Sequence, residues 1–160
     1  MESTVPKDVI AMVGVEKVRH YTVTKRDIKR FAQAVGETNP IYFDEKYAKS
    51  TKNRTIIAPP LFCQTFTFED VPADRLPSDG SPIEMDVPIP AQRTVGGASS
   101  YEIFRRVKVA DQITVKSMLR DVFTKQGKCG KLYFIIVETE FYDQGEKLIA
   151  RETATYIKRI

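Results

Sequence analysis

The second half of the chain contains the pattern that most constrains its fold. From residue 97 onward, apolar and polar side chains alternate in four runs, at residues 99–109, 112–124, 131–142 and 147–160. Turn signals separate these runs: Ala110-Asp111, KQGKCG at 125–130 and DQGE at 143–146. Period-two alternation interrupted by short turns is typical of successive β-hairpins. The sequence therefore predicts an antiparallel meander of four strands joined by three hairpins, with one apolar face that needs a cover.

The first third of the chain predicts one more strand and two helices. Residues 17–23 alternate like a short strand, and Thr24 then caps an amphipathic helix at residues 25–36 that ends at a glycine. After a turn forced by Asn39-Pro40, Asp44 caps a second short helix. This order of elements places helical segments before the meander, where they are available to cover its apolar face.

An apolar segment at residues 59–70 predicts a buried central helix. Pro59 and Pro60 suit the first turn of a helix, where their missing N–H groups are not needed. One face of this segment is apolar and consists of Leu61, Phe62, Thr65 and Phe66. Residues 71–92 then contain five of the nine prolines, which excludes a helix or an inner strand and predicts a long loop.

These elements together predict an α+β fold. Its five-stranded antiparallel sheet wraps around the central helix at 59–70, which is the hot-dog arrangement. A chain of 160 residues is long enough to bury a core and short enough that we expect one domain, at 1–160. The glycines of the segment RTVGG at 93–97 predict a bulge or a close backbone approach.

Composition argues against membrane, metal and nucleic-acid functions. No apolar run approaches the roughly 20 residues of a membrane-spanning helix, and the start MESTVPKD lacks the order of a secretory signal, so we expect a cytoplasmic protein. Cys63, Cys129 and His20 are too widely spaced to predict a metal site or a disulfide. The net charge is +4, but 25 basic residues are interleaved with 21 acidic ones. This predicts solvated helix faces, such as KRDIKR at 25–30, and is compatible with a phosphate-bearing substrate such as an acyl-CoA.

Residues 36–42, with the sequence GETNPIY, followed after five residues by Ala48, resemble the signature of the MaoC-like (R)-specific enoyl-thioester hydratases. That signature runs Gly, Asp, any residue, Asn, Pro, an aliphatic residue, His, five residues, then Ala or Ser. The resemblance extends over nearly the whole chain, through IIAPPLF at 56–62, YEIFRRVKVADQITVKS at 101–117 and VETEFYDQGEKLIARETATYI at 137–157. Within the family, it is strongest to the N-terminal, helper half of double hot-dog dehydratases.

The resemblance implies a particular chemistry. In active members, the Asp and His of the signature activate a water that adds to the double bond, while a backbone N–H at the helix entrance binds the thioester oxygen. Addition of water to an unsaturated thioester builds negative charge on that oxygen and requires a base at the same time. A helix N-terminus meets the first demand, and a His–carboxylate pair meets the second.

Three positions of this chain depart from the active pattern. Glu37 replaces the aspartate, and its extra methylene moves the carboxylate by about 1 Å, which can cost orders of magnitude in rate. Tyr42 replaces the histidine, and a phenol with a pKa of about 10 is a poor base at neutral pH. Pro59-Pro60 stands where active members have His-Gly, so the N–H expected at position 60 is absent.

The leading hypothesis is therefore a non-catalytic subunit that binds an acyl-CoA or acyl-carrier-protein thioester beside a catalytic MaoC-like chain. It predicts substrate contacts at Asn39, Pro59, Pro60 and Phe62, no metal, no cofactor beyond the thioester carrier, and a homodimer when the chain is alone. The second hypothesis is a self-sufficient homodimeric hydratase in which Glu37 and Tyr42 are catalytic. The third is an acyl-CoA-binding module without catalysis.

Several of these residues also have a purely structural interpretation. Asn39 can satisfy the turn before Pro40, and Phe62 can pack as an ordinary core residue. Cys63 lies on the apolar helix and predicts a small buried thiol, and His20 predicts an exposed or structural histidine.

Overall fold

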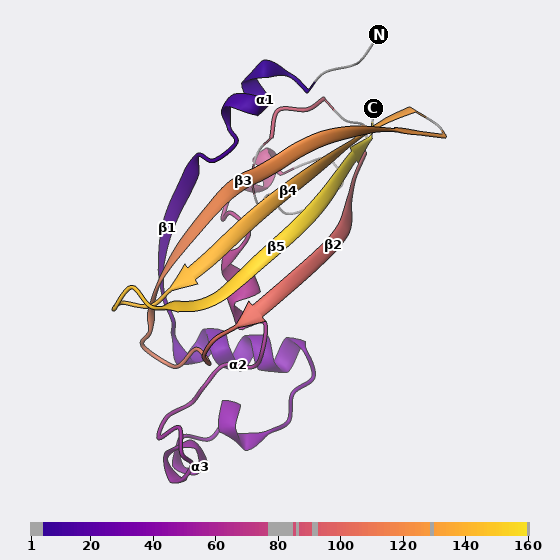
Figure 1. Ribbon diagram of the computed structural model, residues 1–160. Coiled ribbons are helices and arrows are strands. Elements are labelled where there is room, and N and C mark those ends of the chain that lie inside the picture. Colours follow the sequence, from indigo (N-terminus) through magenta and orange to yellow (C-terminus); the bar gives the residue numbers. More distant parts are fainter. Residues whose placement is uncertain (1–4, 77–84, 86, 91–92, 129, 160) are drawn as a thin grey trace.

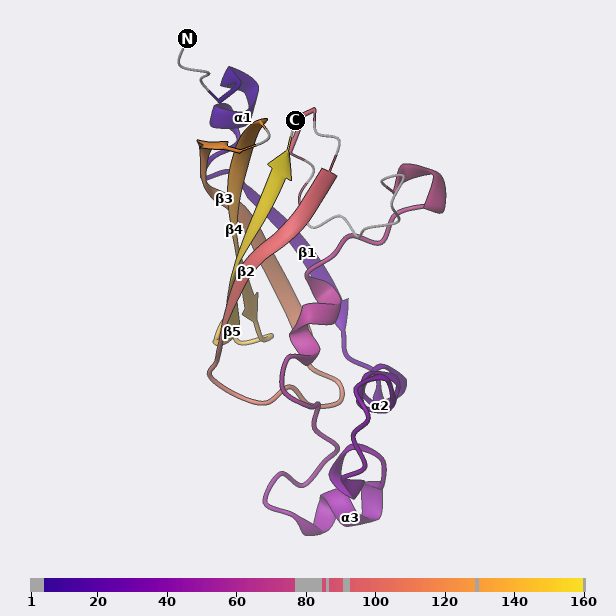
Figure 2. The ribbon, with the colours of Figure 1, turned by 90° about the vertical axis from the view of Figure 1, so that its right-hand side faces the viewer.

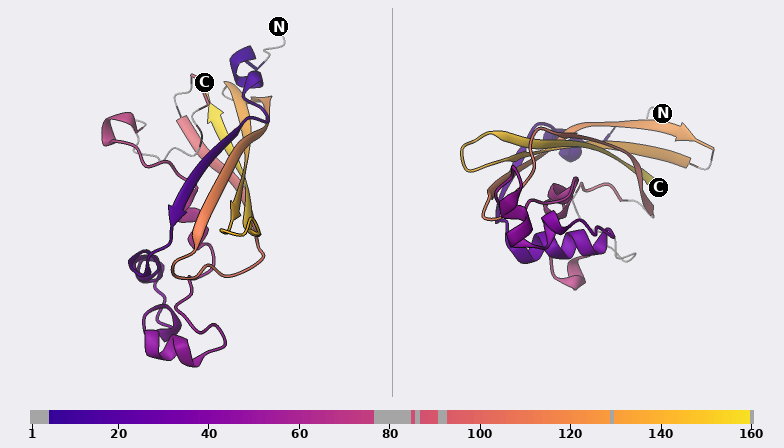
Figure 3. Two further views of the ribbon diagram at one scale, coloured as in Figure 1. Left: turned by 90° about the vertical axis from the view of Figure 1, so that its left-hand side faces the viewer. Right: turned by 90° about the horizontal axis from the view of Figure 1, so that it is seen from below.

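The computed structural model describes residues 5–76, 85, 87–90, 93–128 and 130–159. Five antiparallel strands form one sheet in the order β1-β3-β4-β5-β2, which confirms the predicted five-stranded fold (Figure 1). The strands are β1 (Glu16–Thr22), β2 (Arg93–Ile103), β3 (Gln112–Gly127), β4 (Gly130–Tyr142) and β5 (Leu148–Arg159). The sheet curves over α2 (Lys25–Ala34) and the short helix η2 (Phe62–Phe66) (Figure 3). No helix among the described residues is long and apolar enough to cross a membrane.

The position of β2 corrects the predicted meander of three hairpins. β3, β4 and β5 form two successive hairpins, whereas β2 pairs with β5 at the far edge of the sheet. The predicted run at 99–109 is a strand only as far as Ile103, because the next two amides both bond to the Ile149 carbonyl, at 2.8 and 3.3 Å. Residues 107–109 then pair with residues 56–58. The chain leaves the edge of the sheet at the end of β2 and crosses toward the opposite edge before β3 begins.

A bulge interrupts β2 at Gly97, as the two adjacent glycines predicted. The pairing register with β5 shifts between Gly96 and Ala98. A Cβ atom at Gly97 would lie 3.1 Å from the Thr155 carbonyl oxygen and 3.2 Å from the Ile157 side chain. Because the backbones approach this closely, only a glycine fits without a shift of β5.

α2 begins at the predicted cap and ends two residues before Gly36. The Thr24 hydroxyl accepts a hydrogen bond from the Asp27 amide at 3.2 Å, and the Asp27 carboxylate accepts one from the Thr24 amide at 3.0 Å. This is a complete capping box. At the other end Gly36 has a φ of 76°, and the Glu37 amide bonds to the Ala32 carbonyl at 2.9 Å. The helix therefore ends in a Schellman motif.

Two shorter helices flank α2 in the sequence. α3 (Glu45–Ser50) begins at the predicted cap, where the Asp44 carboxylate accepts the amides of Lys46 and Tyr47 at 2.8 and 3.1 Å. α1 (Lys7–Ala11) was not predicted, and it buries Val9 at the far end of the sheet from α2 (Figure 1).

The central helix is much shorter than the predicted helix at 59–70. The structure has a 3-10 helix of five residues, η2, preceded by Leu61 in the left-handed conformation with a φ of 64°. A left-handed residue interrupts a right-handed helix, so Pro59 and Pro60 lie outside η2. Leu61 is 43% exposed instead of buried. Figure 2 shows η2 beside the concave face of the sheet, where Phe62 is buried.

In the described part of the predicted loop at 71–92, a short helical turn, η3 (Ala73–Arg75), begins after Pro72. Residues 87–90 are neither helix nor strand, as their prolines predicted, and Val87 and Ile89 are buried. Pro77 and Pro82 lie outside the described residues.

The concave face of the sheet has two apolar clusters separated by a polar band. One cluster surrounds η2, and the other lies at the end of the sheet near α1. Between them, Ser117, Thr139 and Glu152 stand opposite one another on β3, β4 and β5, and each is at most 3% exposed. The Thr139 hydroxyl donates to the Ser117 hydroxyl at 3.0 Å.

Side chains at both edges of the sheet complete this polar band. The Glu152 carboxylate accepts hydrogen bonds from the hydroxyls of Thr67 and Ser99, at 3.0 and 2.9 Å. From β1, the Arg19 guanidinium donates to the Ser117 hydroxyl at 3.1 Å and to the Thr67 carbonyl at 2.9 Å. These bonds offset the cost of burying polar groups in the core.

Candidate functional site

The signature segment GETNPIY forms the loop between α2 and α3. Gly36 ends α2, and Asn39 caps the 3-10 helix η1 (Pro40–Tyr42) by accepting the Ile41 amide at 3.0 Å. Asn39 is exposed. The structural interpretation of Asn39 as a turn residue is therefore confirmed, while its predicted contact with substrate stays a prediction.

The two candidate catalytic side chains do not form a bonded pair. Tyr42 is 7% exposed and Glu37 is half-buried. Within the described part of the chain, neither the Glu37 carboxylate nor the Tyr42 hydroxyl has a hydrogen-bond partner. Among the described residues, no side chain is therefore bonded to the Tyr42 hydroxyl as an activating base.

The other candidate residues line a small cavity at the entrance of η2. Its volume is about 10 Å³, which is room for about one water molecule. The cavity is lined by Pro59, Pro60 and Phe62, together with side chains from β2, from the segment that follows β2 and from the start of β5. Glu37, Asn39 and Tyr42 are absent from the lining of this cavity, so it does not bring the two groups of predicted site residues together.

Phe62 is primarily a core residue. Its side chain is 2% exposed, and its ring packs edge-to-face with the rings of Phe31 and Phe66 at centroid distances of 5.6 and 5.3 Å. Such aromatic contacts stabilise a core beyond the effect of burial alone.

Two polar residues of this cavity could not be recognised from sequence as neighbours. Burial raises the pKa of the Cys63 thiol to about 12, so the thiol stays protonated and is not a nucleophile. Burial also raises the pKa of Tyr101 on β2, with smaller contributions in the same direction from the neighbouring Cys63 and from Glu152. Tyr101 escaped prediction because the strand order that brings β2 beside η2 is a long-range property.

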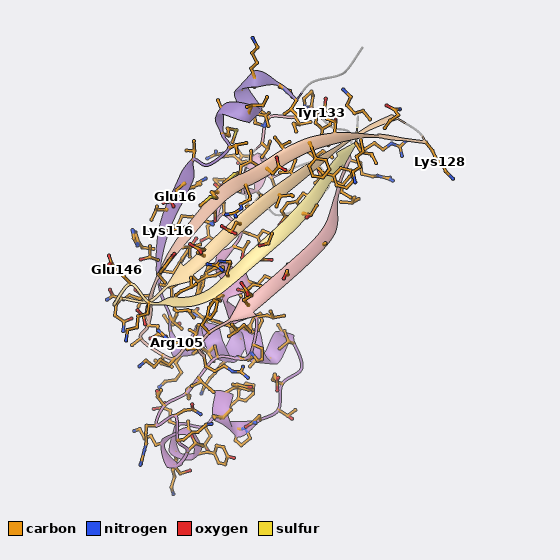
Figure 4. All side chains as sticks on the ribbon, viewed as in Figure 1. Glu16, Arg105, Lys116, Lys128, Tyr133 and Glu146 are labelled. Carbon is orange, nitrogen blue, oxygen red and sulfur yellow. The ribbon has the colours of Figure 1, made fainter. Side chains whose placement is uncertain are left out.

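A charged network closes the same end of the sheet. The guanidinium of Arg105, which Figure 4 labels at this end of the sheet, donates to the carboxylates of Asp111 at 2.7 Å and Asp143 at 3.1 Å. Asp111 is 1% exposed. Because the Arg105 guanidinium is bonded to two carboxylates, it is not free to bind a phosphate group of an acyl-CoA.

The described residues contain no group of three or more His, Cys, Asp or Glu side chains placed to hold an ion. Cys63 is a free buried cysteine, as predicted, and His20 is exposed with its ring Nδ1 3.1 Å from the Thr114 hydroxyl. Cys129 lies outside the described residues.

The curved sheet, the buried short helix and the thioester signature define the class as MaoC-like hot-dog hydratases and dehydratases. Residues 11–152 match the family model described as FAS1-like, dehydratase domain region. The chain belongs to this family.

Named relatives agree with this assignment. A UPF0336 protein of Parafrankia sp. is 26% identical over 140 residues, which cover 87% of this chain and 85% of that protein. A probable enoyl-CoA hydratase alpha subunit of Thermomonospora curvata is 26% identical over 131 residues, which cover 78% of this chain and 41% of the subunit.

Solved structures share the fold at low sequence identity. The R-hydratase PhaJ1 of Pseudomonas aeruginosa superposes with a TM-score of 0.65 at 20% identity, covering 92% of this chain and 81% of that one. A chain of the ChsH1-ChsH2 complex of Mycobacterium tuberculosis superposes with a TM-score of 0.69 at 20% identity, covering 96% and 95%.

Proposed function

We propose that this chain is the non-catalytic, substrate-binding subunit of a heteromeric (R)-specific acyl-thioester hydratase or dehydratase. The observation that carries the proposal is the entrance of η2, where Pro60 has no N–H to bind a thioester oxygen. The signature loop supports the same conclusion, because Tyr42 stands in place of a base and has no bonded partner among the described residues. A second MaoC-like chain with the complete Asp, His and Gly set supplies the chemistry.

The relatives support a subunit role without fixing it. One relative is named as an alpha subunit of an enoyl-CoA hydratase, and one structural neighbour belongs to a two-component complex. In the proposal, the chain acts in the cytoplasm, needs no cofactor beyond the thioester carrier, and lines the acyl tunnel with residues from its η2 region.

The proposal predicts that the purified chain hydrates crotonyl-CoA no faster than the uncatalysed background. Mixing it with a co-encoded MaoC-like chain that has the complete catalytic set should give turnover at least 100-fold above background, the scale of a single acid-base contribution. Loss of the enoyl absorbance measures both. Turnover by this chain alone that Glu37→Ala abolishes would contradict the proposal and favour a self-sufficient homodimer.

We further propose that the two chains pair through β2. This strand lies at the edge of the sheet, and the exposed fraction is 47% for Val95, 44% for Ile103 and 55% for the adjacent Phe104. An edge strand of eleven residues with exposed apolar side chains is a template for strand pairing. A second copy occupies this edge when the chain is alone, and the catalytic chain occupies it in the working complex.

Val95→Glu is expected to weaken dimerisation at least tenfold, because pairing would bury the new carboxylate, and about 1.4 kcal/mol corresponds to that factor. Sedimentation over a range of concentrations measures the change. Val18→Glu is a matched control, since Val18 is 48% exposed and lies on β1 at the opposite edge. Equal dissociation constants for the two variants would rule out pairing through β2.

A further inference from the structure

One face of α2 forms an open basic groove. The groove has a volume of about 720 Å³ and is lined by Thr24, Lys25, Arg26, Lys29, Arg30, Gln33 and Phe43. This volume falls within the roughly 300–1,000 Å³ that is typical of small-molecule sites. Four of its seven lining residues are cations, and all four lie on α2.

The positive charge of the groove is largely uncompensated. Lys25 forms an ion pair with Glu45 of α3. Lys29, Arg26 and Arg30 have no ion-pair partner in the described part of the chain. A hydrogen bond from Lys25, followed by the charges of Lys25, Lys49 and Lys29, holds the pKa of Glu45 below its ordinary value. Asp27 offsets part of the charge, but its carboxylate is already engaged in the capping box.

The spacing of the cations disfavours the helix that presents them. Lys25 and Lys29 are four residues apart, and so are Arg26 and Arg30. Like charges at this spacing repel each other and destabilise a helix. An anion bound between the two pairs would remove this repulsion, so the arrangement favours a ligand with more than one negative charge.

Phe43 adds an aromatic surface to the groove. It is half-buried and follows Tyr42 directly, so it joins the groove to the signature loop. A purine ring can stack on a phenyl face, and guanidinium groups bind phosphates with paired N–H donors. An adenine nucleotide bound here would leave the rest of its molecule next to the loop that contains Glu37 and Tyr42.

We propose that the α2 groove, with Arg26, Lys29, Arg30 and Phe43, binds the 3′-phosphoadenosine diphosphate end of a coenzyme A thioester. This inference rests on the proposed thioester-binding function and names the carrier for it. A concave site with one aromatic ring matches a nucleotide. The cations alone would also suit an acidic carrier protein, and the aromatic ring of Phe43 beside them is the feature that favours a nucleotide.

The test uses adenosine 3′,5′-bisphosphate as the probe and isothermal titration calorimetry on the full chain. We expect Arg26→Glu/Arg30→Glu to weaken binding of the probe at least tenfold. We also expect the unaltered chain to lose affinity for the probe as the salt concentration rises. Both arginines are exposed on α2, and both arginine and glutamate favour helices, so the fold should persist. Circular dichroism of the variant checks this.

The matched control is Lys7→Glu/Lys128→Glu, which changes the net charge equally. Lys7 lies on α1, which is at the end of the molecule away from α2 (Figure 1), and Lys128 follows β3 at the same end (Figure 4). We expect it to bind the probe within twofold of the unaltered chain. A second variant, Phe43→Ala, should weaken binding of the probe more than binding of inorganic pyrophosphate, which has no base to stack.

Three results would overturn the inference. The first is no binding of the probe by the unaltered chain, and the second is equal weakening of probe binding in both double variants. The third is binding of a phosphopantetheinylated carrier protein by a chain that does not bind the probe. The probe contains no thioester and needs no partner chain. Binding of the probe in the groove without hydration by the mixture would therefore contradict only the proposed function. Hydration of crotonyl-CoA that is unaffected by Arg26→Glu/Arg30→Glu would contradict only the assignment of the groove.

Discussion

Replacing Phe62 with alanine is expected to lower the free energy of unfolding by about 3–5 kcal/mol, the range for removing a buried aromatic ring from a packed core. The ring is 2% exposed and packs edge-to-face against Phe31 and Phe66. Because these neighbours belong to α2 and η2, the loss would loosen the contact between the helices as well as their contact with the sheet.

Urea unfolding followed by circular dichroism measures this change. Tyr47→Ala is a suitable control, since Tyr47 is 46% exposed on α3, and exposed substitutions usually stay within about 0.5 kcal/mol. A change below about 1 kcal/mol in Phe62→Ala would contradict the packing argument. It would favour the predicted role of Phe62 in substrate contact, because a residue that lines an empty tunnel loses few contacts when truncated.

Replacing Arg105 with alanine is expected to cost about 3 kcal/mol, the lower end of the range for breaking a buried ion pair. The lower end applies because the Arg105 side chain is 31% exposed, whereas Asp111 is 1% exposed. Without the guanidinium, the Asp111 carboxylate keeps the Lys108 amide at 3.0 Å as a donor. Its second oxygen already has no partner among the described residues. An unpaired charge would then remain buried.

The loss of stability in Arg105→Ala is expected to depend on pH. Amides of Lys147 and Gly145, and then Arg105, hold the pKa of Asp143 below its ordinary value. A lowered pKa in the folded state stabilises the protein above the unfolded pKa of about 3.9, and this contribution is lost as pH falls through the folded pKa. The deficit of Arg105→Ala should therefore be largest near neutral pH and shrink below about pH 4.

Thermal or urea unfolding at several pH values measures this dependence. Arg106→Ala is the control, because Arg106 is exposed beside Arg105, and we expect its unfolding free energy to change by less than about 0.5 kcal/mol. Equal stability of both variants at neutral pH would show that the network of Arg105 contributes nothing measurable.

Local signals allowed both ends of α2 and the start of α3 to be predicted. Thr24, Gly36 and Asp44 act through hydrogen bonds to residues a few positions away, so their neighbours in the sequence are sufficient evidence. The glycine pair at 96–97 likewise marked a bulge, because a Cβ atom at Gly97 would crowd the backbone and side chains of β5. The alternation of apolar and polar residues is also a local signal, and it predicted the strands.

Long-range and strain-dependent features could not be predicted in this way. Alternation does not specify which strand a run pairs with, so the place of β2 beside β5 was missed. The left-handed conformation of Leu61 shortened the central helix, and an exposed leucine at that point gives no warning in the sequence. The candidate site was predicted from a signature, and the roles of Glu37, Tyr42 and the two prolines stay predictions.

The polar band across the sheet also specifies the register of its strands. A slip of one residue turns an apolar face toward water and is excluded by alternation alone. A slip of two residues keeps every side chain on its face, and alternation cannot detect it. In this sheet such a slip of β5 would move Glu152 from its position opposite Thr139 to one opposite Val137 or Phe141. The hydrogen bonds of the buried Glu152 carboxylate therefore favour a single register between β5 and β4.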